Sequence, residues 1–73
     1  MAKKFVYQVA DREWVDNEAF GAGWREARAY AKEIHAAVYR LVFRKGEPVQ
    51  EVFLRSGCFL RADLVDEKSI VVF

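Results

Sequence analysis

The segment from Asn17 to His35, NEAFGAGWREARAYAKEIH, is the only part of the chain in which apolar residues recur at helical spacing. At steps of four, three, four and three residues it carries Phe20, Trp24, Ala27, Ala31 and Ile34. These steps place all five on one side of an α-helix, so the segment predicts one amphipathic helix, with Asp16 or Asn17 as its N-cap. A helix with a single apolar stripe has to bury that stripe against another element.

The rest of the chain alternates with the period of two that is typical of β-strands. Strands are predicted at 4–10, 37–44, 49–55, 58–61 and 70–73, with turns at 45–48 and 56–57. The first strand and the helix have a suitable length for a crossover, and the later turns make an antiparallel meander. The expected fold is therefore α+β: a single helix packed on one face of a four- to five-stranded, mostly antiparallel sheet, in the element order β-α-β-β-β-β.

Residues 1–73 are expected to form a single small domain, because no linker, repeat or low-complexity tract divides them. A domain of this size buries only about 60% of the surface that its unfolded chain exposes, and small domains often need a disulfide, a metal or a partner subunit. Cys58 is the only cysteine and His35 the only histidine, so neither an internal disulfide nor a closed Cys/His zinc site can form. The remaining ways to stabilise such a small domain are self-association and unusually good packing.

Charge and hydropathy exclude some classes of protein. Twelve Lys and Arg against eleven Asp and Glu give a net charge of +1, which argues against the strong basic excess of a dedicated nucleic-acid binder. No run of about 18 apolar residues could span a membrane, and the apolar run after Lys3 and Lys4 is too short for a signal peptide. With one unpaired thiol and no export signal, a cytoplasmic location is expected.

The register of the hairpin formed by 37–44 and 49–55 decides which residues share a face of the sheet. We expect Arg44 opposite Val49 and Tyr39 opposite Leu54. The face expected under the helix then carries Ala37, Tyr39, Leu41, Phe43, Val52 and Leu54. The other face carries Val38, Arg40, Val42, Arg44, Glu51, Phe53 and Arg55, joined by Leu60 if the next turn sets it opposite Phe53. A bulge at Ser56-Gly57 would change that last pairing.

The face away from the helix is the main candidate for function, because one helix covers only one side of a sheet. An apolar patch on a small soluble domain marks an interface. The candidate interface consists of Val38, Arg40, Val42, Arg44, Phe53, Arg55 and Leu60. The expected function is a protein-interaction module that forms a homodimer through this face, with another protein as the alternative partner. The alternative is that the segment around Trp14, or residues 62–69, folds over the face and covers it.

A second hypothesis is single-stranded nucleic-acid binding, which combines cations with aromatic stacking platforms. The cations would be Arg40, Arg44 and Arg55 on the sheet and Arg25, Arg28 and Lys32 along one edge of the helix. Two features oppose this hypothesis. Tyr39 points inward in the expected register, and Glu51 lies within the patch, where it would repel phosphate.

No motif indicates catalysis, a metal site or a cofactor, so we expect none of the three. His35 and Cys58 could form a thiolate–imidazole pair only if the helix end met the start of the fourth strand, and no third residue is placed to orient the ring. His35 is expected instead to cap the helix C-terminus, and Cys58 to be a small buried or strand-edge residue. Four carboxylates close in sequence match no calcium loop: Asp11, Glu13, Asp16 and Glu18.

Overall fold

The computed structural model describes residues 4–11, 13–14, 17–45 and 47–73, except for the side chains of Lys4 and Arg44. Within these residues the strands are β1 (Lys4–Ala10), β2 (Asn17–Ala19), β3 (Ala37–Arg44), β4 (Glu47–Phe53) and β5 (Phe59–Arg61). The α-helix is α1 (Trp24–Ile34), and two short 3-10 helices follow β5, η1 (Ala62–Leu64) and η2 (Glu67–Ser69).

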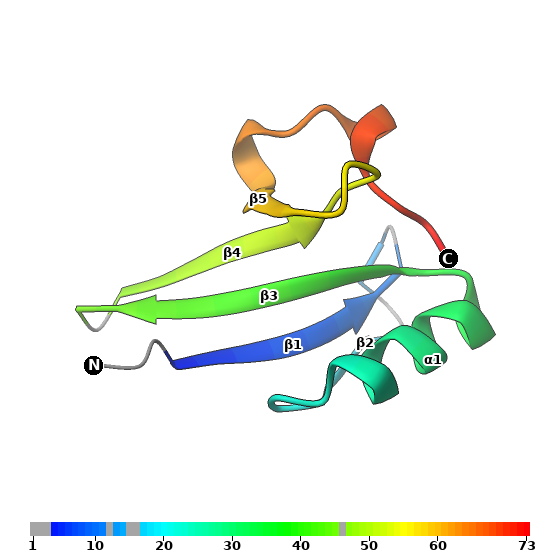
Figure 1. The fold of residues 1–73 in the computed structure, drawn as a ribbon, viewed down its shortest axis with the longest axis horizontal. Coiled ribbons are helices and arrows are strands. Elements are labelled where there is room, and N and C mark those ends of the chain that lie inside the picture. The colour runs from blue at the N-terminus through cyan, green and yellow to red at the C-terminus, as the bar shows by residue number, and fades with distance from the viewer. Residues whose placement is uncertain (1–3, 12, 15–16, 46) are drawn as a thin grey trace.

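The strands form one five-stranded sheet in the order β2-β1-β3-β4-β5, and all neighbouring pairs are antiparallel. The predicted α+β class, with a single helix on a mostly antiparallel sheet, is confirmed. The predicted crossover is wrong, because β1 and β3 run in opposite directions. The short strand β2 returns the chain along β1 before the helix begins, and the helix then leads into β3 on the other side of β1 (Figure 1).

The helix begins at Trp24, later than predicted, because residues 17–19 pair with β1 instead. The pairing continues beyond β2: the Phe20 amide donates to the Tyr7 carbonyl at 2.9 Å, and the Tyr7 amide donates to the Gly21 carbonyl at 2.7 Å. Gly21 has a φ of +56°, in the left-handed region that glycine adopts readily, and this turns the chain out of the strand.

Asn17, one of the two predicted N-caps, does not cap the helix. Asn17 lies in β2, and Asp16 lies outside the described residues. The N-cap is Gly23, where an added β-carbon would lie 2.7 Å from the Glu26 Oε2 and 3.1 Å from the Phe20 carbonyl oxygen. The predicted apolar stripe is nevertheless buried, since Ala27 and Ala31 are in the core and the other members pack against it: Phe20, Trp24 and Ile34.

The β3–β4 register differs from the predicted one by two residues. Arg44 lies opposite Glu47 and Tyr39 opposite Val52, so only residues 45 and 46 connect the strands. Pro48, predicted in the turn, lies in β4 where β5 does not reach, and a proline is tolerated there because no neighbouring strand needs its missing N–H. Because side chains alternate with a period of two, a shift of two keeps every residue of β3 and β4 on its predicted face.

The β4–β5 register differs by one residue, and this changes the faces. Phe53 lies opposite Phe59 and Val52 opposite Leu60. The extra residue lies in the turn before β5, where Gly57 has a φ of +92° and the Leu54 amide donates to the Cys58 carbonyl at 2.9 Å. Phe59 therefore joins the face of Phe53, and Leu60 lies on the opposite one.

The helix packs on the face of the sheet that was predicted to be uncovered. Ala27 and Ala31 form one buried cluster with Val9 and Val38, and all four are fully buried. We call this side, with Val9, Val38, Val42 and Phe53, the helix face. In Figure 1, α1 lies beside the end of the sheet where β1 ends and β3 begins, while the β3–β4 hairpin reaches the other end.

The opposite face, with Ala37, Tyr39, Leu41, Phe43 and Val52, is partly covered by the chain itself. A second cluster joins Ala37, Val52 and Leu54 to the segment after β5, through Ala62, Val65 and Ile70. The Trp14 ring also packs on Tyr39, with the ring centroids 4.9 Å apart. The covering predicted as an alternative is therefore present, but on the other side of the sheet.

The predicted last strand, 70–73, is reduced to an isolated antiparallel bridge between Leu54 and Ile70. Beyond it, the Val71 amide donates to the Phe53 carbonyl at 3.2 Å and the Phe73 amide to the Ala36 carbonyl at 3.0 Å. These bonds join the tail to the end of β4 and to the residue before β3. The tail therefore runs across the end of the sheet and does not pair along a strand.

Truncation of Phe53 tests which face is buried. The Phe53 ring lies 5.1 Å from Trp24 and 5.2 Å from Phe59 between centroids. Phe53→Ala should lower the free energy of unfolding by about 3–4 kcal/mol in urea denaturation, because it opens a cavity under the helix. Leu64→Ala, at a residue that is 75% exposed, should lower it by less than about 1 kcal/mol. Equal, small effects of both substitutions would contradict the assigned packing.

Candidate interaction surface

The predicted interface residues do not form one exposed surface. Val38 and Val42 are buried, at 0% and 4% exposed, and Phe53 is half-buried beneath Trp24. Arg55 is exposed in the turn after β4, and Leu60 lies on the opposite face. The Arg44 side chain lies outside the described part of the structure. The premise that this face is uncovered is therefore wrong.

Aromatic rings fill the space between the N-terminal end of the helix and the sheet. Trp24 contacts three rings on the helix face, with centroid distances of 5.5 Å to Tyr7, 5.1 Å to Phe53 and 5.9 Å to Phe59. Phe73 from the C-terminal tail stacks on Phe53 at 6.0 Å with an interplanar angle of 12°. Aromatic pairs at these distances contribute about 0.5–1.5 kcal/mol each beyond their buried area, so this cluster fixes the helix to the sheet.

Arg40, the central cation of both sequence hypotheses, is held within the molecule. Its Nε and Nη2 donate to one oxygen of Glu51 at 2.9 and 2.7 Å. Its guanidinium carbon lies 4.3 Å from the Phe59 ring centroid and 5.8 Å from that of Phe5. Glu51 thus lies within this group of residues, as predicted. Its ion pair with Arg40 compensates the positive charge that a phosphate or a partner's carboxylate would otherwise bind.

The sheet retains an apolar surface at the end remote from the helix, on the opposite face. We call it the hairpin-end surface, and it consists of Val6, Leu41, Phe43, Pro48 and Leu60. Phe43 and Leu60 are 40% and 53% exposed, and Val6 and Leu41 are half-buried. Val6 lies directly opposite Leu41, and Phe43 opposite Pro48, so these four residues form a patch over three strands. Leu60, on β5, lies opposite Val52 farther along the same face, and Gln50, opposite Leu41, lies between Leu60 and that patch.

Sequence reasoning assigned Leu41 and Phe43 to the side under the helix, and thus missed this surface. The first strand contained a signal for the true arrangement. Phe5, Tyr7 and Val9 alternate with Val6, Gln8 and Ala10, and the first set is bulkier and more apolar. Since Val9 pairs with Val38, Phe5, Tyr7 and Val9 lie on the same face as Val38. This face therefore has more apolar surface to bury under the helix than the opposite face of β1. Only the strand order reveals this alignment.

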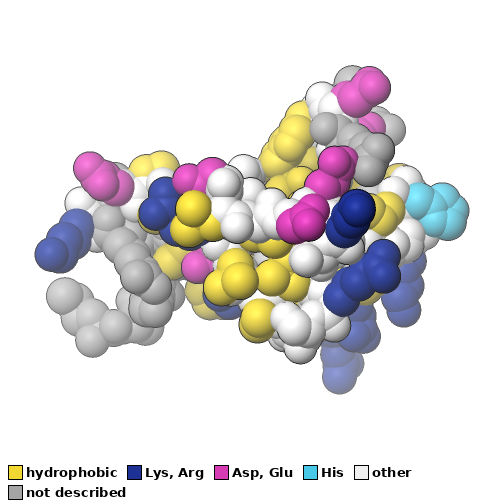
Figure 2. Space-filling view, turned by 90° about the horizontal axis from the view of Figure 1, so that it is seen from above, with side chains coloured by type: hydrophobic (Ala, Val, Ile, Leu, Met, Phe, Trp, Pro, Cys, Tyr) yellow, Lys and Arg dark blue, Asp and Glu magenta, His cyan; other side chains and the backbone are white. Residues whose placement is uncertain are grey.

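The basic helix residues remain exposed. Arg25, Arg28 and Lys32 are all at the surface of α1, and the Arg28 guanidinium carbon lies 5.8 Å from the Trp24 ring centroid. Figure 2 shows Lys and Arg side chains gathered at the end of the molecule that carries the histidine. The three helical cations therefore lie together on α1, whereas Arg40 lies on the sheet and is paired with Glu51.

His35 and Cys58 have separate neighbours. His35 is the C-cap of α1 with a φ of +55°, as predicted for its position, and its Nδ1 lies 3.2 Å from the Phe73 carbonyl oxygen. Cys58 is exposed, and its Sγ lies 3.0 Å from the Ser56 Oγ. Among the described residues, no group of three or more His, Cys, Asp or Glu side chains could hold a metal ion.

No helix in the described part of the chain has the length and apolar character needed to cross a membrane. Comparison of the sequence with protein-family models and with curated proteins, and of the fold with solved structures, finds no match. A functional conclusion therefore has to come from the surface of this molecule.

Proposed function

We propose that the protein is a small interaction module that forms a homodimer through the hairpin-end surface. The observation that supports this proposal is the exposure of Phe43 beside half-buried Val6 and Leu41, with the exposed Leu60 farther along the same face of the sheet. By contrast, α1 packs over Val9, Val38 and Phe53, the segment after β5 packs on Val52 and Leu54, and Trp14 packs on Tyr39. Large aromatic and aliphatic side chains that stay exposed together are typical of protein interfaces.

Self-association suits this surface because a two-fold dimer needs only one self-complementary patch. The hairpin-end surface is mainly apolar, with Gln50 opposite Leu41, and its rim contains the exposed Lys45 and Glu47, which carry opposite charges. Across a two-fold axis, an antiparallel arrangement of two such rims can place unlike charges opposite each other. Dimer formation would also bury additional apolar surface, which a domain of 73 residues with a small core needs for stability.

The test is the oligomeric state of a charged variant. Wild-type protein should be a dimer by light scattering coupled to size exclusion at micromolar concentration, and Phe43→Glu should be a folded monomer. The reason is that a charged side chain would replace an apolar ring that the contact buries. Val72→Glu is the matched control: it adds the same charge at a valine that is 58% exposed at the other end of the molecule, and it should remain dimeric.

Two results would contradict the proposed homodimer. One is a wild-type protein that is monomeric over the whole micromolar range. The other is a Phe43→Glu variant that stays dimeric, with a circular dichroism spectrum like that of the wild type.

Single-stranded nucleic-acid binding is the second candidate, and the exposed cations of α1 support it. Arg25, Arg28 and Lys32 are exposed and adjacent on one helix. They provide a short positive stripe for a phosphate backbone, and Trp24 at the start of the helix is partly accessible for stacking. The pairing of Arg40 with Glu51 counts against an extension of this stripe over the sheet.

Salt dependence tests the second candidate. If three cations each contact a phosphate, the affinity for a labelled single strand should fall roughly 20-fold between about 50 and about 200 mM salt. The triple substitution R25Q, R28Q and K32Q should abolish retention, whereas K45Q, R61Q and K68Q, which remove the same charge elsewhere, should reduce it far less. Wild-type protein that shows no salt-sensitive retention would exclude this function.

A further inference from the structure

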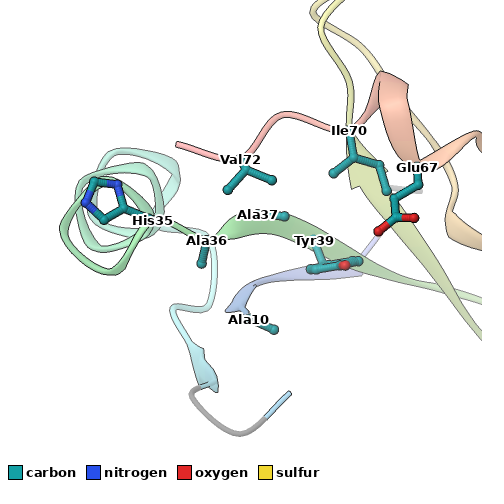
Figure 3. Close-up of a pocket in the computed structure, with 8 residues that line it drawn as sticks. All are labelled: Ala10, His35, Ala36, Ala37, Tyr39, Glu67, Ile70 and Val72. Atoms are coloured by element: carbon teal, nitrogen blue, oxygen red, sulfur yellow. The ribbon is translucent and has the colours of Figure 1, made fainter. Parts of the chain in front are cut away.

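A pocket of about 350 Å³ opens on the opposite face of the sheet, at the end remote from the hairpin-end surface. Its walls come from the end of β1, the start of β3 and the C-terminal segment (Figure 3). Among the described residues, those that line it are Ala10, His35, Ala36, Ala37, Tyr39, Glu67, Ile70 and Val72. This volume lies at the lower end of the range of about 300–1,000 Å³ in which proteins bind small molecules.

The pocket exists because small side chains meet at its floor. Ala10 lies directly opposite Ala37 in the β1–β3 ladder, and Ala36 precedes it; all three are buried. The small side chains of Ala10 and Ala37 leave a depression that Ile70 and Val72, from the tail that crosses above, do not fill (Figure 3). The tail is held in place by its bond from the Phe73 amide to the Ala36 carbonyl. The walls are therefore fixed before any ligand arrives.

Two groups give the pocket a preference for positive charge. The Tyr39 ring lies along the floor, and the carboxylate of Glu67 projects from η2 toward it (Figure 3). Burial raises the pKa of the Tyr39 hydroxyl above its ordinary value of 10.0, so the phenol stays neutral and its ring keeps a π face that attracts cations. A carboxylate has about four acceptor positions, so Glu67 can receive an ammonium in addition to its contacts within the protein.

We propose that this pocket binds a small primary amine with an apolar body. The ammonium would lie between the Glu67 carboxylate and the Tyr39 ring, and the apolar body would cover the alanine floor beneath Ile70 and Val72. An anionic ligand of the same shape is repelled by Glu67, and a neutral one lacks both charge-dependent contacts. The site is separate from the hairpin-end surface, and its occupation does not depend on dimer formation.

Three probes with the same ring and different head groups test this proposal: 2-phenylethylamine, 2-phenylethanol and phenylacetate. Titration of the ¹⁵N-labelled full chain, followed by chemical shifts, should show saturable changes at Ala37, Tyr39 and Ile70 with the amine. A ligand of this size is expected to have a Kd on the order of 1 mM. The alcohol should bind about fivefold more weakly or worse, and phenylacetate should not saturate.

Glu67→Gln should remove the preference, so that the amine binds no better than the alcohol. Glu33→Gln, which removes an equally exposed carboxylate from α1, should leave the amine affinity unchanged. Tyr39→Leu keeps this part of the pocket apolar but removes the aromatic ring, so it should weaken the binding of the amine more than the binding of the alcohol. The proposal is overturned if the three probes bind wild-type protein equally, if none gives saturable shifts at the pocket, or if Glu67→Gln retains the preference for the amine.

Discussion

The contact between two alanines of the helix and two valines of the sheet determines the rest of this structure. Ala27 and Ala31 of α1 meet Val9 and Val38 in a cluster that is closed to solvent. Because alanine carries only a methyl group and valine is compact, helix and sheet can pack closely here, and the larger rings lie at the helix N-terminus. Trp24 then fills the gap over Phe53 and Phe59, so the side on which the helix lies is fixed by packing at both of its ends.

Because the helix lies on that side, the opposite face has to be covered by other parts of the chain, and the described residues cover only part of it. The segment after β5 packs on Val52 and Leu54, and Trp14 packs on Tyr39. Both coverings lie toward the end of the sheet that carries the helix. The β3–β4 hairpin extends beyond the segment after β5 (Figure 1), and Phe43, near the tip of this hairpin, is 40% exposed. The pocket beneath the tail and the hairpin-end surface thus have a common cause in an incomplete second layer.

Most of the fold could be predicted from hydrophobic periodicity, because the period of an element depends only on local geometry. The strands at 4–10 and 37–44 have the predicted limits, and the apolar stripe of the helix is buried. The start of the helix could not be predicted this way, since Asn17 to Ala19 form hydrogen bonds with β1, a partner distant from the helical pattern. The candidate interface failed for a related reason: which face the helix covers depends on strand order, and one extra residue near Gly57 moved Leu60 to the other side.

The side on which the helix lies can be measured directly from proton–proton distances in solution. A nuclear Overhauser spectrum of the methyl-labelled protein should show cross-peaks from the Ala27 and Ala31 methyl groups to the methyl groups of Val9 and Val38, which share one buried cluster. The same alanines should show none to Leu41 or Val52 across the sheet. Cross-peaks from Ala31 to Leu41 and Val52, without any to Val38, would mean that the helix covers the other face and would contradict the arrangement described above.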